Sequence, residues 1–194
     1  MTAPLTWRSA LYVPASNARF VEKAQTRGAD AVILDLEDGV AAAQKPEARA
    51  RAAATIAPGS PAAWAVRLNS PLRLAAADIE AVIRPGLAAL LIPKCDSPDR
   101  LHWLAEAVAE LEAERGLDPG SVALVPIIET PQALARAAGI AGAQPRCAAL
   151  MLGGEDFAAA IGATTDPDVL QLPRQMIVFA ARSAGVTPMG LMQS

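Results

Sequence analysis

The chain has 194 residues, a formal net charge of −3, and a composition that is 53% hydrophobic but only 4% aromatic. This length is typical of one domain with a sizeable core, and the few aromatic residues predict a core built from Ala, Leu, Val and Ile. Nothing in the sequence is basic enough for a nucleic-acid surface, and no apolar run reaches the roughly 18 residues that span a bilayer. With no recognisable signal peptide and two widely separated cysteines, Cys95 and Cys147, we expect a reduced, cytoplasmic protein with free thiols.

Strands and helices are predicted to alternate along the whole chain. The apolar runs predict strands at 9–13, 31–40, 64–68, 89–92, 122–128, 148–152 and 187–191. Helices are predicted from 16 or 17 to about 27, and at 46–56, 74–83, 99–115, 132–141, 157–161 and 173–184. The repeat of roughly 30 residues is the length of one βα unit, which indicates a parallel sheet with right-handed crossovers. Either a (β/α)8 barrel or an open doubly wound sheet has this alternation, and no G-x-G-x-x-G follows the first strand to favour a dinucleotide fold.

Polar side chains at the predicted strand ends favour the barrel. Five successive strands are followed by charged or amide residues: Glu37 and Asp38, Arg67 and Asn69, Lys94, Glu129, and Glu155 with Asp156. In barrel enzymes the carboxyl ends of the strands carry the active site, whereas an open sheet gathers its ligands at one switch point. The sequence therefore predicts a single α/β barrel domain over residues 1–194.

Glu129 and Asp156 are the sharpest candidates for metal ligands. They follow consecutive apolar strands, so their carboxylates should lie side by side, and two such groups repel unless a cation lies between them. Mg2+ takes one or two carboxylates and keeps its other positions for water and substrate. The alternative is that each carboxylate caps the helix that follows it. The single histidine, His102, lies in a predicted helix, which argues against a Ser-His-Asp triad or a zinc site of several histidines.

Arg67 and Lys94 are further candidates for substrate-binding residues, and Cys95 is a candidate nucleophile. Arg67 follows a strand among acids, so its guanidinium either forms ion pairs or binds a substrate carboxylate or developing alkoxide. Lys94 can act on substrate as a point charge, or it can be an ordinary solvated lysine. No base is placed to activate Cys95, and Cys147 is predicted to be a packing residue.

The strand-end motifs resemble those of the citrate lyase beta-subunit / HpcH–HpaI aldolase family. They run through almost the whole chain in order: R-S-A-L-Y-V-P-A-S-N-A-R-F, G-A-D-A-V-I-L-D-L-E-D-G-V, V-R-L-N-S, L-I-P-K, I-I-E-T and L-G-G-E-D-F. The resemblance implies a TIM-like barrel of the phosphoenolpyruvate-binding type and a homo-oligomer, usually a trimer. It also implies Mg2+-dependent making or breaking of a carbon–carbon bond in a citryl- or malyl-type thioester, with acetyl-CoA and a 2-oxo acid as the products.

The resemblance also implies roles for individual residues. Glu129 and Asp156 would be the metal ligands, and Arg67 would hold the oxo or alkoxide oxygen. Glu37 and Asp38 would orient metal-bound water or the thioester end. Strand alternation, apart from the resemblance, puts Asp35 on the same side as Glu37, where we expect it to act as support. Arg19 would contact a CoA phosphate.

One part of the family pattern lies beyond Ser194. The resemblance implies an eighth strand and a C-terminal segment that helps cover the thioester site, and this sequence contains neither. A second hypothesis is therefore a truncated, non-catalytic barrel that binds metal and oxo acid or assembles with a full-length relative. A third, an aldolase of free acids without CoA, is disfavoured because no histidine follows the second strand.

Overall fold

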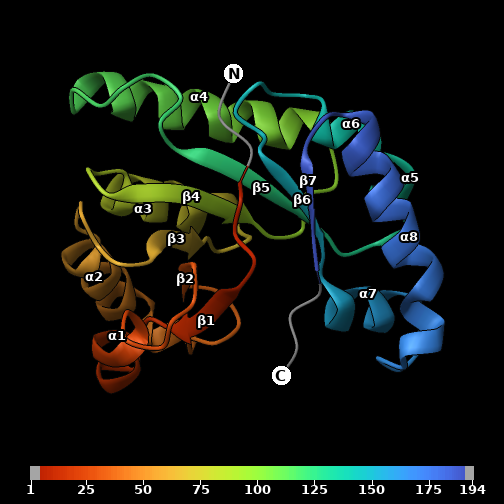
Figure 1. Ribbon diagram of the computed structural model, residues 1–194, viewed down its shortest axis with the longest axis horizontal. Coiled ribbons are helices and arrows are strands. Elements are labelled where there is room, and N and C mark those ends of the chain that lie inside the picture. Colours follow the sequence, from red (N-terminus) through yellow and green to blue (C-terminus); the bar gives the residue numbers. More distant parts are fainter. Residues whose placement is uncertain (1–4, 191–194) are drawn as a thin grey trace. The chain divides into compact units, whose positions relative to one another are not determined.

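The structure is a computed structural model that describes residues 5–190 (Figure 1). The described chain divides into two compact units, which we name the β1–β4 unit (residues 6–91 and 106–123) and the β5–β7 unit (residues 5, 92–105 and 124–190). No helix in the described range is both long and apolar enough to cross a membrane. The prediction of a single barrel domain over residues 1–194 stays a prediction.

The β1–β4 unit contains a sheet of parallel strands: β1 (Ala10–Pro14), β2 (Ala31–Asp35), β3 (Ala63–Arg67) and β4 (Leu87–Ile92). The strand predicted at 31–40 ends at Asp35, and every residue of β2 is buried, as the apolar run at 31–34 predicts. The register places Asp35 opposite Arg67, so two charged residues meet at the ends of neighbouring strands. The helical segments that connect these strands are α1 (Ala18–Ala24), η1 (Ala42–Gln44), α2 (Lys45–Thr55) and α3 (Leu72–Val82).

The β5–β7 unit contains a second set of parallel strands, β5 (Ala123–Ile128), β6 (Ala149–Leu152) and β7 (Thr187–Met189). The helix α4 (Pro98–Glu114) precedes β5 in the chain, and α5 (Pro131–Ala135), α6 (Ala137–Ala141), α7 (Gly154–Ala160) and α8 (Pro167–Ser183) follow. All seven predicted strands are present, although Leu191, the predicted end of the last, lies outside the described residues.

Two predicted helices differ from the observed ones. The helix predicted at 132–141 is two short helices, because the backbone leaves helical geometry at Arg136 (φ −108, ψ 3). The helix predicted to start at Pro173 begins at Pro167, where the Asp166 side chain accepts a hydrogen bond from the backbone N–H of Asp168. A proline at the first helical position and an acidic cap form a complete start signal, so Pro173 lies inside the helix instead.

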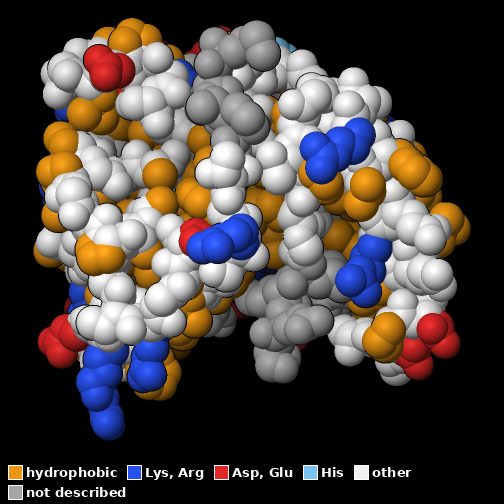
Figure 2. All heavy atoms as spheres, in the orientation of Figure 1, with side chains coloured by type: hydrophobic (Ala, Val, Ile, Leu, Met, Phe, Trp, Pro, Cys, Tyr) orange, Lys and Arg blue, Asp and Glu red, His pale blue; other side chains and the backbone are white. Residues whose placement is uncertain are grey.

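The helix α8 is amphipathic, but its outward face still carries large apolar side chains. Leu170 and Ile177 are buried, whereas Leu172 and Phe179 are 64% and 71% exposed. On the face shown in Figure 2, hydrophobic side chains lie at the surface among scattered Lys and Arg side chains.

Candidate functional site

Arg67 is the centre of a buried ion-pair cluster in the β1–β4 unit. Its Nε donates to Asp35 Oδ1 and its Nη2 donates to Asp35 Oδ2, both at 2.7 Å, which is the bidentate geometry of a strong guanidinium–carboxylate pair. Its Nη1 lies 3.2 Å from Glu37 Oε2 and 3.8 Å from Asp38 Oδ2. The guanidinium also stacks over the Tyr12 ring at 5.5 Å.

Two backbone N–H groups complete the bonding of Asp35. They belong to Glu37 and Gly39, and they donate to Oδ1 at 2.9 Å and to Oδ2 at 2.8 Å. A Cβ at position 39 would lie 2.5 Å from Asp35 Oδ2, so glycine is required for this close approach. Lys45 holds the same loop from outside, because its Nζ donates to the carbonyls of Leu36 and Glu37.

The cluster keeps Arg67 charged. Burial alone lowers the pKa of Arg67, but the hydrogen bonds and charge of Asp35 and the charge of Glu37 raise it by more, so the net pKa lies above its usual value. The sequence predicted Arg67, Glu37 and Asp38 as a group, and the structure brings them together around Asp35.

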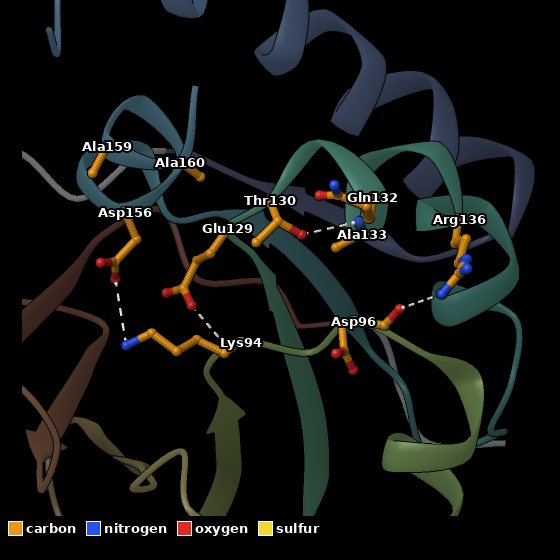
Figure 3. Close-up of a pocket in the computed structure, with 10 residues that line it drawn as sticks. All are labelled: Lys94, Asp96, Glu129, Thr130, Gln132, Ala133, Arg136, Asp156, Ala159 and Ala160. Atoms are coloured by element: carbon orange, nitrogen blue, oxygen red, sulfur yellow. Dashed lines mark hydrogen bonds and ion pairs between the residues drawn. The ribbon is translucent and has the colours of Figure 1, made fainter. Parts of the chain in front are cut away.

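Glu129, Asp156 and Lys94 meet at one end of a pocket in the β5–β7 unit (Figure 3). Lys94 follows β4, Glu129 follows β5 and Asp156 follows β6, as the strand-end pattern predicts. Glu129 Oε2 accepts a hydrogen bond from the backbone N–H of Lys94 at 2.7 Å, and Lys94 Nζ lies 3.9 Å from Asp156 Oδ2. Glu129 is buried, whereas the side chains of Lys94 and Asp156 are 43% and 42% exposed.

Two unusual backbone positions support Glu129. Lys94 has a φ of 49°, the only positive value for a non-glycine residue in the described range, and this places its N–H against the carboxylate. A Cβ at position 153 would lie 2.4 Å from Glu129 Cγ and 2.7 Å from Oε1, so Gly153 leaves the space that this side chain fills. The local backbone is therefore shaped around one carboxylate.

The alternative role as helix caps does not fit these carboxylates. Thr130, not Glu129, caps α5, because its Oγ1 accepts the N–H of Ala133 at 3.1 Å. Gly153 occupies the capping position of α7 and Asp156 lies within the first turn of that helix. Neither predicted ligand is therefore used as a cap.

The donor set at this end of the pocket suits Mg2+. It offers two carboxylates, and no cluster of three or more His, Cys, Asp or Glu side chains able to hold a metal occurs among the described residues. Mg2+ is usually held by one or two protein carboxylates and completes its octahedron with water and substrate oxygens. Glu129 and Asp156 would be those ligands.

The remaining predicted residues lie outside these two sites. Arg19 is exposed in the first turn of α1, and His102 lies in α4, where it contacts the Gln144 side chain. Cys95 and Cys147 are buried free thiols, and burial raises the pKa of each to about 12. A raised pKa disfavours the thiolate nucleophile at both positions, and the burial of Cys147 confirms the packing role predicted for it.

Sequence reasoning missed the far end of the pocket and one structural carboxylate. Arg136, Asp96 and Gln132 line the pocket, but they fall inside predicted helical or loop segments with no strand-end signal. Asn69, predicted from its strand-end position, instead donates through its backbone N–H and Nδ2 to the fully buried Asp78.

The chain belongs to the HpcH/HpaI aldolase/citrate lyase family, whose model matches residues 8–194. It is 32% identical over 95% of its length to human mitochondrial citramalyl-CoA lyase, and 33% identical over 93% to citrate lyase subunit beta of Escherichia coli K12. It spans 58% and 62% of the lengths of these two relatives.

Solved structures confirm the fold class. Citrate lyase beta subunit from Mycobacterium tuberculosis, solved with oxaloacetate and magnesium, matches 95% of this chain and 78% of its own with a TM-score of 0.73 and 31% identity. The predicted α/β fold of TIM-like type is thus confirmed, with seven strands and no eighth over residues 5–190.

Proposed function

We propose that the protein is a Mg2+-dependent carbon–carbon lyase that acts on a citryl- or malyl-type thioester and yields acetyl-CoA, or an acyl-carrier thioester, and a 2-oxo acid. The observation that carries this proposal is the buried Glu129 carboxylate. It is fixed by the Lys94 N–H and by the absence of a side chain at Gly153, at the end of a pocket that Asp156 also lines. The names of the relatives, citramalyl-CoA lyase and citrate lyase, supply the substrate class.

The protein's own residues set up the metal end of the pocket. The Lys94 N–H binds one oxygen of Glu129, which fixes the direction of the carboxylate before any ligand arrives. Asp156 is half exposed and its nearest cation is the Lys94 ammonium at 3.9 Å, so it can turn toward a metal with little loss. Mg2+ bound here would polarise the carbonyl of a 2-oxo acid.

The role of Arg67, to hold the oxo or alkoxide oxygen, stays a prediction from the family resemblance. In the β1–β4 unit its guanidinium is already held by Asp35 and Glu37, which suits a fixed positive charge for an oxyanion. The roles predicted for Glu37, Asp38 and Arg19 stand on the same basis. Assembly as a homo-oligomer is likewise proposed from the resemblance.

Calorimetric titration with Mg2+ and pyruvate or oxaloacetate tests the proposal. We expect the unmodified protein to bind the oxo acid only with Mg2+, and Glu129→Gln and Asp156→Asn each to weaken Mg2+ binding at least about tenfold, as loss of a charged ligand does. Glu155→Gln is the matched control, because Glu155 is an exposed neighbour in α7 that does not line the pocket. Unchanged Mg2+ binding in Glu129→Gln would overturn the proposed site.

A turnover assay separates the lyase from the second hypothesis. Mg2+-dependent release of acetyl-CoA from malyl- or citryl-CoA, abolished by a chelator, is the result expected of a lyase. Binding of Mg2+ and oxo acid without cleavage of any such thioester would instead support a non-catalytic binding protein.

A further inference from the structure

The pocket extends well beyond its metal end. Its volume is about 660 Å3, and its lining includes Glu129 and Asp156 at the metal end and Asp96, Gln132 and Arg136 beyond it. Pockets of roughly 300 to 1,000 Å3 bury drug-sized ligands, so this volume exceeds what a three-carbon oxo acid needs. The extra space ends at a second charged group, the Arg136 guanidinium (Figure 3).

One short segment of the chain carries both ends of the pocket. Glu129 and Thr130 close β5, Thr130 caps α5, and Arg136 follows the last residue of that helix. The rise of α5 separates Pro131 from Arg136 by roughly 8 Å. Arg136 lies at the break between α5 and α6. Its side chain points toward the loop that contains Asp96, as Figure 3 shows.

Arg136 is weakly held where it stands. Its Nη1 donates to the carbonyl oxygen of Asp96 at 3.5 Å, near the limit for a hydrogen bond. It forms no ion pair with a carboxylate of the described chain. Arg67, by contrast, donates two bonds of 2.7 Å to Asp35. A guanidinium with its fork open in a pocket suits a carboxylate or a phosphate, which it can bind in bidentate fashion.

We infer that Arg136 is a specificity-determining residue that binds a second anionic group of the ligand whose 2-oxo acid end lies at Glu129 and Asp156. This inference rests on the proposed function and narrows its substrate class. The pocket would favour oxo acids with a distal carboxylate over those that carry only the 2-oxo carboxylate. A phosphate is the other source of the same anionic chemistry.

Calorimetry with a series of acids tests this inference. Pyruvate has no distal anion, whereas oxaloacetate and 2-oxoglutarate carry a carboxylate one and two methylene groups further on. With Mg2+ present, we expect Arg136→Met to weaken binding of at least one diacid by about 10- to 100-fold and to leave pyruvate binding within about twofold. Arg136→Lys keeps the charge without the fork and should show a smaller loss for the same acid.

Controls and the phosphate arm complete the test. Arg182→Met removes an exposed arginine of α8 outside the pocket and should bind every acid like the unmodified protein. In the phosphate arm, inorganic phosphate is titrated into the pyruvate–Mg2+ complex. A loss of phosphate binding in Arg136→Met, with diacids unaffected, assigns the anion as phosphate.

Two outcomes would overturn the inference. If Arg136→Met binds diacids and phosphate as before, or loses pyruvate and diacids equally, Arg136 does not read a distal anion while the metal site stands. If the unmodified protein binds no oxo acid with Mg2+, the proposed function and the inference fail together.

Discussion

The Arg67 cluster and the Glu129–Asp156 pocket use the same residue types in opposite ways. In the cluster, the charged side chains of Arg67 and Asp35 are 8% and 5% exposed and their atoms meet at 2.7 Å. In the pocket, Lys94 and Asp156 are 43% and 42% exposed and their atoms lie 3.9 Å apart. The Arg67–Asp35 pair is therefore short and buried, whereas the Lys94–Asp156 pair is long and partly exposed to water.

This difference predicts that the Arg67 cluster matters for stability and that the Glu129–Asp156 pocket matters mainly for ligand binding. A buried pair is costly to break, because the partner left behind keeps a desolvated charge. A half-exposed pair contributes little to stability, because water and salt screen it. Changes in the cluster should therefore lower the free energy of unfolding in addition to any effect on substrate, whereas changes in the pocket should appear mainly in ligand affinity.

The largest effect is expected from Arg67→Met. It leaves the buried carboxylates of Asp35 and Glu37 without their cation, which should lower the free energy of unfolding by about 3–5 kcal/mol. Urea denaturation followed by circular dichroism measures this change. Arg73→Met, which removes an exposed arginine of α3, should stay within about 0.5 kcal/mol. A loss below about 1 kcal/mol for Arg67→Met would show that water enters the cluster.

The two thiols report on the β5–β7 unit alone, because Cys95 and Cys147 both lie in it and are the only cysteines of the chain. Burial raises the pKa of each to about 12 from 9.0, so the folded chain favours the neutral thiol. The stability from this shift is fully present below about pH 9 and is lost as the pH rises from 9 toward 12.

Thiol labelling with an aromatic disulfide measures this protection. At pH 8 we expect both thiols to react at least about a hundredfold more slowly in the folded chain than in urea, because only opened molecules expose a thiolate. The double variant Cys95→Ala with Cys147→Ala should lose less stability between pH 9 and 12 than the unmodified protein. Rapid labelling at pH 8 without denaturant would contradict the burial of these groups.

Glycine substitutions separate the two regions more finely. Gly39→Ala pushes a methyl group against Asp35 Oδ2 and should lower the free energy of unfolding by about 1–3 kcal/mol. Gly153→Ala pushes a methyl group against Glu129 and should weaken Mg2+ binding several-fold as the carboxylate moves. Gly139→Ala in α6 meets nothing within 4 Å and should be neutral or stabilising. If Gly153→Ala left Mg2+ binding unchanged, the position of Glu129 would not matter for the metal.

Much of the fold was predictable, because a strand buried on both faces has a continuous apolar sequence. The run at 31–34 and the acids that follow gave both the strand β2 and the polar group at its end. The pairing of Asp35 with Arg67 was not predictable, since it depends on which residues the register sets opposite one another. Local sequence places charges at a strand end but does not choose their partners.

Two local features carry too little sequence signal to be predicted, and a third was missed despite a clear signal. Nothing in Q-A-L-A-R-A-A-G-I-A marks the helix break at Arg136, because nearly all of these residues are compatible with a helix. Lys94 adopts a left-handed backbone that favours Gly or Asn, so its φ is set by its surroundings and not by its type. The start of α8 was missed although Asp166 and Pro167 mark it, because the prediction places Pro173 at the first helical position.

The smallest effect, and the finest test of the difference between the regions, is expected from Lys94→Met. Its ammonium lies 3.9 Å from Asp156 at an exposed site, so the free energy of unfolding should change by less than about 1 kcal/mol. Mg2+ affinity should rise about two- to fivefold, because removal of a nearby positive charge favours a cation, and the gain should shrink at high salt. Lys94→Gly should be more stable than Lys94→Ala by about 1 kcal/mol, since glycine adopts the positive φ without strain. Calorimetry at two salt concentrations and urea denaturation measure these changes. A tenfold fall in Mg2+ affinity for Lys94→Met would contradict the expectation, because it would mean that the ammonium positions the carboxylates and does not compete with the metal.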